Sequence, residues 1–172
     1  MFLVSRQSAS ARNSETVHVV QHMAPGGIET LVLDLVGRSG GNDWILSLEG
    51  TPESLCANWP ALNAVRSRLI GLNKGRGFSL SLIKRLSDDM RATSPRMVVA
   101  HHIGPLIYAG AAARLPGVPR IVHVEHDVWP YASAKARSYT RIASAVIRPR
   151  HVAVSNAGAA RLKEIVPGCD VT

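Results

Sequence analysis

The sequence is poor in cysteine and in long apolar runs, and each shortage excludes a class of protein. Its two cysteines, Cys56 and Cys169, stand far apart and fit no zinc, haem or CxxC spacing. We therefore expect no disulfide framework and a reducing compartment. No uninterrupted apolar stretch approaches the ~18 residues of a membrane span. With 172 residues, 46% hydrophobic and 19% charged, the composition predicts one globular domain with its own core.

Three motifs of well-defined sites are also missing. There is no GxxxxGK[ST], which excludes a P-loop, and no GxSxG, so a serine nucleophile is not supported. No GxGxxG follows the first apolar run. Glu49 stands where a Rossmann ribose-binding acid would lie, but without the glycine pattern a dinucleotide site is not expected.

Acidic residues are scarce, with 12 Asp and Glu against 20 Lys and Arg, a net charge of +8. Between residues 128 and 163 there is no acid, and the basic residues there are Lys135, Arg137, Arg141, Arg148, Arg150, Arg161 and Lys163. Such an excess attracts nucleic acid, anionic lipid or phosphorylated ligands, although a solvated basic face would explain it as well. Aromatic residues that stack on bases make up only 5%, and no nucleic-acid-binding module is recognisable, so nucleic acid is not expected as a partner.

The first 16 residues are polar and rich in serine and arginine, so they are predicted to form a disordered tail ahead of a domain at residues 17–172. The apolar stretch at the start is too short for a signal peptide, and a short organelle presequence is the remaining alternative.

Six short apolar runs recur along the chain at roughly even spacing, at residues 17–20, 44–48, 69–72, 97–100, 121–124 and 152–154. Unbroken apolarity is typical of strands that are covered on both faces. Helical patterns fill residues 28–36, 79–90, 106–115, 133–147 and 156–165. The helix predicted at residues 133–147 has Tyr139, Ile142, Ala143 and Val146 on one side. The alternation predicts an α/β fold: a doubly wound, Rossmann-like parallel sheet with helices on both faces.

Polar residues and glycines gather where these strands would end, which is the edge at which open parallel sheets bind ligands. They are His22, Gly26, Gly27, Glu49, His101, His102, Glu125, His126, Asp127, Ser155 and Asn156. Two glycines at a helix start would let the backbone approach an anion, although an ordinary tight turn explains them equally well. We expect one shared functional edge, with the alternative that these are ordinary polar loops.

The histidines allow a second interpretation. His123, Glu125 and His126, together with His101 and His102, would suit a metal ion. Histidine clusters in loops are more often hydrogen-bonding sets, so no metal is expected.

Four segments, in order, resemble landmarks of the GT-B glycosyltransferases of family 4. They are VHVVQHMAPGGIE at residues 17–29, VVAHH at 98–102, IVHVEHD at 121–127 and VAVSNA at 152–157. The resemblance runs to residue 172. It implies an N-terminal, acceptor-side domain that works with a second, donor-binding domain. Such enzymes transfer a sugar from a nucleotide sugar, generally without a metal or other cofactor and with retention of anomeric configuration.

The resemblance also implies roles for individual residues. Gly26 and Gly27 would approach the donor diphosphate, and His126 would be the catalytic residue beside the transferred sugar. The acceptor side would comprise His22, His101, His102, Glu125, Asp127, Ser155 and Asn156. We expect the donor-binding domain to be absent from this chain, so that activity requires such a domain in trans.

The acceptor is expected to be a glycan or a lipid-linked saccharide handled in the cytoplasm, with docking on the anionic inner face of the membrane as an option. Arg137, Arg141 and Arg148 fall on one helical face, where each would favour an anionic surface. The alternative function is a non-catalytic binding module, a pseudoenzyme or a subunit that recruits a true transferase.

Overall fold

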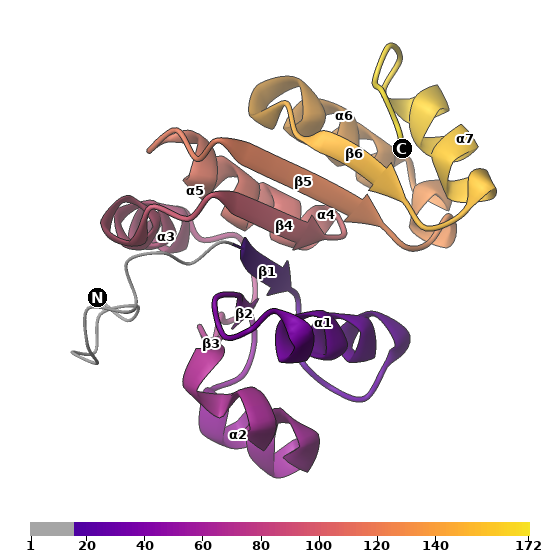
Figure 1. Ribbon diagram of the computed structural model, residues 1–172. Helices are drawn as coiled ribbons and strands as arrows, with labels where there is room; N and C mark the ends of the chain where they lie inside the picture. Colours follow the sequence, from indigo (N-terminus) through magenta and orange to yellow (C-terminus); the bar gives the residue numbers. More distant parts are fainter. Residues whose placement is uncertain (1–15) are drawn as a thin grey trace.

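A computed structural model describes residues 16–172, apart from the side chains at 129 and 130, as a six-stranded sheet flanked by helices (Figure 1). The strands are β1 (Thr16–Val20), β2 (Trp44–Ser47), β3 (Leu69–Gly71), β4 (Met97–His101), β5 (Arg120–Glu125) and β6 (Arg150–Ala153). All neighbours pair in parallel, in the order β3-β2-β1-β4-β5-β6. The predicted doubly wound parallel sheet is confirmed, and the strand order reverses between β1 and β4.

The helices are α1 (Gly27–Arg38), α2 (Pro52–Asn58), α3 (Leu80–Thr93), α4 (Ile103–Pro105), α5 (Ala111–Arg114), α6 (Ala134–Ile147) and α7 (Asn156–Ile165). Shorter turns are η2 (Pro60–Arg68), η3 (Leu106–Gly110) and η4 (Trp129–Ala132). α4, η3 and α5 follow one another without a break, and the five residues of η3 form a π-helical segment between them. The predicted helix at residues 106–115 began three residues late, so it merged η3 with α5 and missed α4. Helix α2 and η2 were not predicted.

Right-handed crossovers place the helices on opposite faces of the two halves of the sheet. Helix α1 packs on the β1–β3 half, where Val20 and Ile45 meet Val32 and Leu55. Helices α3, α5 and α6 lie behind β4 and β5 in Figure 1, and their apolar side chains form the larger core with those strands. In this view no helix lies in front of β5 and β6.

Two sequence predictions change at the level of single residues. Thr16 was assigned to the tail but is the buried first residue of β1, while the rest of that tail lies outside the described residues. Of the four apolar residues on one side of α6, only Ala143 is buried, and the other three are 47–68% exposed. Within residues 16–172, no helix combines the length and the apolarity needed to cross a bilayer.

Candidate functional site

The glycine loop after β1 brings backbone donors to the carboxyl edge of the sheet. Gly26 is the extended N-cap of α1, and its carbonyl accepts from the Thr30 N–H at 2.9 Å. A Cβ at Gly26 would collide with the Glu29 carboxylate, whereas a Cβ at Gly27 would meet nothing within 4 Å. The first N–H groups of a helix have no partner within the helix and so favour an anion, and here the Glu29 carboxylate lies against Gly26.

Three histidines on one face of the sheet form what we call the imidazole chain. Nδ1 of His18 lies 3.3 Å from Nε2 of His101, and Nδ1 of His101 lies 3.0 Å from Nε2 of His126. The register explains the chain: His18 pairs with Val99 and His101 pairs with Val124. His101 comes two residues after Val99, the partner of His18, and His126 comes two residues after Val124, the partner of His101. Residues two apart in a strand share a face, so the three rings follow one another on the same face.

The imidazole chain is held in the neutral form. Burial, reinforced by the neighbouring imidazoles, lowers the pKa of His101 to about 3. Burial likewise lowers the pKa of His18 and of His126. A neutral imidazole has one N–H and one lone pair, so the tautomer of one ring dictates that of the next. Nδ1 of His126 is the outer end of the chain, and the chain sets whether this nitrogen donates or accepts.

A buried carboxylate organises the turn after β5. Glu125 is 2% exposed, and one of its oxygens accepts from Nδ1 of His102 at 2.9 Å. The same oxygen accepts from the backbone N–H groups of His126 at 3.1 Å and Asp127 at 3.3 Å, and the other accepts from the Tyr131 hydroxyl. The two backbone N–H groups that follow β5 therefore both donate to the Glu125 side chain.

The carboxylate also sets the charge of its partners. Burial alone would lower the pKa of His102, but the hydrogen bond and charge of Glu125 outweigh it and raise that pKa. Burial alone would raise the pKa of Glu125, but the hydrogen bonds from His102 and Tyr131 outweigh it and lower that pKa. Burial and the same carboxylate raise the pKa of Tyr131. The site therefore pairs a buried carboxylate with an imidazole that protonates readily, next to a chain of imidazoles that do not.

His102 reaches this carboxylate from a strained backbone. Its φ of 71° lies in the left-handed region, which side chains other than glycine rarely adopt. Its N–H donates to the Val124 carbonyl at 3.0 Å, and its carbonyl accepts from the Leu106 N–H at 3.2 Å. Such conformations persist where the surroundings hold them and are found at ligand sites.

The structure joins five of the predicted site residues into one network: His101, His102, Glu125, His126 and Asp127. The glycine loop lies at the same edge. His22 is half-buried in the loop after β1. Ser155 caps α7 by accepting from the Gly158 N–H at 3.1 Å, and Asn156 is exposed. Among the described residues, no hydrogen bond links the side chains of these three to the network.

Two members of the network were missed in the sequence. His18 was visible as a lone polar residue inside an apolar strand, which is a signal, whereas Tyr131 carried none. A second pair, His123 and His151, lies on the other face with its Nδ1 atoms 3.1 Å apart. Residues 16–172 contain no group of three or more histidine, cysteine or acidic side chains arranged to hold a metal ion.

Comparison with known proteins points to one family. The model of Glycosyltransferase Family 4 matches residues 25–172. Two similar solved structures are Alr3699/HepE of Anabaena, in complex with UDP and glucose (TM-score 0.68) and with UDP-glucose (TM-score 0.64). Each is 14% identical, and the match covers 91% of this chain and 42% of that one. The apo lipopolysaccharide outer core galactosyltransferase WaaB has a TM-score of 0.61 at 14% identity, over 91% of this chain and 44% of that one.

At such identities the structural likeness concerns the fold. The chain spans less than half the length of these proteins. No curated protein sequence matches it.

Proposed function

We propose that this chain, which belongs to glycosyltransferase family 4, forms the acceptor-side wall of a site that transfers a hexose from a nucleotide sugar to a glycan or lipid-linked acceptor. The observation that supports this best is the meeting of the glycine loop with the histidine–carboxylate network where the strand order reverses. Open α/β sheets bind ligands at that point. The opposite, donor-binding wall would come from a second domain, on the same polypeptide or on another.

The start of α1 would act on the donor diphosphate. Transfer leaves negative charge on the departing phosphate, and preorganised N–H donors stabilise such charge as it develops. The backbone N–H groups at the start of α1 supply such donors, and the glycines at 26 and 27 add no side chain of their own there. Glu29, in the first turn, opposes an anion, and His102, whose pKa is raised by Glu125, offsets that charge whenever it is protonated.

His126 would orient the transferred sugar. Its Nε2 is engaged by His101, so Nδ1 is the ring nitrogen left to hydrogen-bond a sugar hydroxyl. A neutral ring suits this position, because an imidazolium would oppose the positive charge that develops at the anomeric carbon. Here the protein contributes positioning, which lowers the barrier without a covalent step on this residue.

The remaining predicted residues would form the acceptor side. Asp127 stands beside His102, with 3.7 Å between Oδ2 and Nε2, and it is partly exposed. His22, Ser155 and Asn156 flank the network on the loops after β1 and β6. No hydrogen bond within residues 16–172 links the side chains of His22, Ser155 and Asn156 to the network, so they can meet an acceptor without disturbing His126.

Nuclear magnetic resonance tests the proposal on the chain as it is. The 15N-labelled chain is titrated with UDP, GDP and ADP, each as the free nucleotide and as its glucose conjugate, against uridine alone. We expect millimolar binding that shifts the amides of residues 26–29 and the ring signals of His126 for diphosphates only. Shifts confined to other edges of the sheet, or equal shifts with uridine, contradict the proposal.

A transfer assay then tests the chemistry. The chain is incubated with labelled nucleotide sugars and a membrane and glycan fraction from its own cells, which also supplies any second domain. Transfer is expected to fall by about 100-fold in His126→Ala, within the range for loss of a positioned group. Lys163→Ala, an exposed change on α7, is the control. Equal transfer by the His126 variant and the control would refute the assigned role.

A further inference from the structure

The edge of the sheet opposite the candidate site carries a pocket lined by four arginines, which we call the arginine pocket. It has a volume of about 550 Å³. Arg120 and Arg150 are the first residues of β5 and β6, and Arg114 and Arg148 stand at the ends of α5 and α6. The other lining residues are apolar and include Met97, Val118 and Val122.

The register of β5 and β6 places Arg120 and Arg150 on the same face of the sheet. Arg150 pairs with Val122, which stands two residues after Arg120, so Arg120 and Arg150 emerge from one face of adjacent strands. In Figure 1 no helix covers that face of β5 and β6. Two guanidinium groups on neighbouring strands can therefore address one ligand.

None of the four guanidinium groups has a hydrogen bond or ion pair within residues 16–172, and no acid lines the pocket. Other arginines behave differently. Arg137 donates to the Tyr131 carbonyl at 2.7 Å, and Arg141 donates to the Ile165 carbonyl at 3.0 Å. Of the three arginines on the helical face predicted to dock on a membrane, Arg148 alone has no partner within residues 16–172.

Helix dipoles offset part of the positive charge of these arginines. Arg114 and Arg148 stand at helix C-termini, which carry about −0.5 charge each and attract cations. Together the two helix ends offset about one of the four positive charges. They do not explain Arg120 and Arg150, which begin strands. A surplus of about three charges therefore remains around one hollow, where like charges repel.

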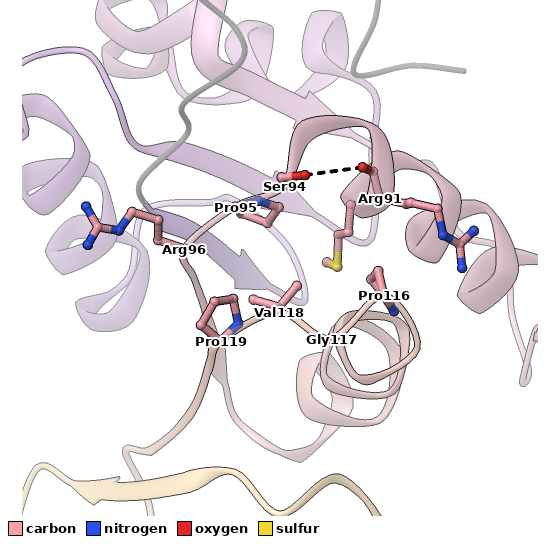
Figure 2. A pocket seen from close by; sticks show the side chains of 9 residues that line it. Arg91, Ser94, Pro95, Arg96, Pro116, Gly117, Val118 and Pro119 are labelled. Carbon is pink, nitrogen blue, oxygen red and sulfur yellow. Dashed lines mark hydrogen bonds between the residues drawn. The ribbon is translucent and has the colours of Figure 1, made fainter.

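A smaller pocket beside the arginine pocket differs from it in the arrangement of its arginines. It has a volume of about 250 Å³ and shares Val118 and Pro119 with the arginine pocket. Figure 2 shows Pro95, Pro116 and Pro119 around it, with the side chains of Arg91 and Arg96 pointing away on opposite sides. The two pockets adjoin, yet only the larger is lined by unpartnered cations.

We propose that the arginine pocket binds a phosphate-bearing anion, at a site separate from the one for sugar transfer. Guanidinium groups match phosphate in charge and in planar hydrogen-bonding geometry. The volume falls within the range of small-molecule sites and accommodates a diphosphate or a phospholipid headgroup.

Inorganic pyrophosphate and vesicles are the probes, because they separate a soluble phosphate from a lipid headgroup. Pyrophosphate binding is followed by the Nε–H signals of arginine and by calorimetry. Vesicles of phosphatidylglycerol mixed with phosphatidylcholine are compared, by sedimentation, with vesicles of phosphatidylcholine alone. The test variant is Arg120→Gln/Arg150→Gln. The control is Arg38→Gln/Lys163→Gln, which removes two exposed charges elsewhere.

We expect pyrophosphate to bind and its affinity to fall about tenfold for each pocket arginine removed, since charged hydrogen bonds contribute about 1.5–3 kcal/mol. The control should stay within about twofold, and binding should weaken with salt. Vesicle binding that is lost in the same variant assigns the phosphate to a lipid, and pyrophosphate binding without vesicle binding assigns it to a soluble ligand. Absence of pyrophosphate binding, or equal loss in the control, overturns the proposal. The readouts involve no sugar transfer, so they stand or fall apart from the proposed function.

Discussion

Acid should destabilise this chain well above the pH at which most carboxylates titrate, because of its buried histidines. His101 is 3% exposed and His123 is 0% exposed, and burial lowers the pKa of each to about 3. In the unfolded chain both titrate near 6.5. Between about pH 3 and pH 6.5 these two histidines are protonated in the unfolded state and neutral in the folded state. The free energy of unfolding therefore falls as the pH falls.

The magnitude follows from the two histidines. Each unbound proton contributes about 1.4 kcal/mol per pH unit, so these two histidines alone give a slope of about 2.7 kcal/mol per unit. The lowered pKa values of His18, His126 and His151 add to this slope. Between pH 7 and pH 4.5 the loss is about 5 kcal/mol, against a total stability of about 5–15 kcal/mol for a domain. Carboxylates whose pKa is lowered, such as Glu125, lose their contribution only below about 4.5, so this window isolates the histidines.

Urea unfolding followed by circular dichroism, repeated from pH 7 to pH 4.5, measures the slope. His101→Gln and His123→Gln should each reduce it by about 1.4 kcal/mol per unit, whatever they do to stability at pH 7. Leu62→Ala, in the other core, should lower the free energy of unfolding by about 2–5 kcal/mol at every pH and leave the slope unchanged. A wild-type slope below about 1.4 kcal/mol per unit, or an unchanged slope in both histidine variants, would refute the reasoning.

Three further predictions concern single contacts. Glu125→Gln should lower the pKa of His102 in an NMR titration and cost about 1.5–3 kcal/mol of stability, and a His102 pKa that does not move would contradict the assigned pairing. The stability that His102 contributes is full below pH 6.5 and is lost as the pH rises through its raised folded pKa, so the cost of Glu125→Gln should shrink at alkaline pH. Gly71→Ala should cost about 1–3 kcal/mol, because the new Cβ would lie 2.9 Å from the Thr51 backbone carbon, whereas Gly37→Ala, in open space on α1, should stabilise by about 0.5–1 kcal/mol. His101→Asn should change the 15N shifts of the His126 ring at neutral pH, which reports its tautomer, while Asp127→Asn should not.

The sheet was predictable because its strands are buried on both faces. Such strands need unbroken apolar runs, and each of the six predicted runs overlaps an observed strand. Helix α2 was missed because its seven residues give too little periodicity to detect. The local signals available were its capping box, formed by Thr51 and Ser54, and Pro52 at its first position.

Helix α6 shows where periodicity misleads. Tyr139, Ile142 and Val146 are spaced for burial, but the structure buries Thr140 and Ser144 in place of them. The Thr140 hydroxyl donates to the Ala136 carbonyl at 3.0 Å, which satisfies it within its own helix. Small side chains let the helix approach its neighbours closely, so size and local hydrogen bonding outweighed hydrophobicity there.

The position of the candidate site was predictable and its internal connections were not. That polar residues after parallel strands share one edge follows from topology alone. The imidazole chain depends in addition on register, since a shift of one residue would turn His18 or His101 to the other face. Register is fixed by the whole core, which a single sequence does not reveal.

The carboxyl and amino edges of the sheet differ in charge. At the carboxyl edge, burial suppresses charge on the imidazole chain and confines protonation to His102 beside its carboxylate. At the amino edge, four arginines stand with no acid to neutralise them. A neutral edge favours ligands that are positioned by hydrogen bonds, while a cationic edge favours ligands held by charge. Salt should therefore weaken binding at the amino edge far more than at the carboxyl edge, and this difference separates the two sites even when one ligand carries both a sugar and a phosphate.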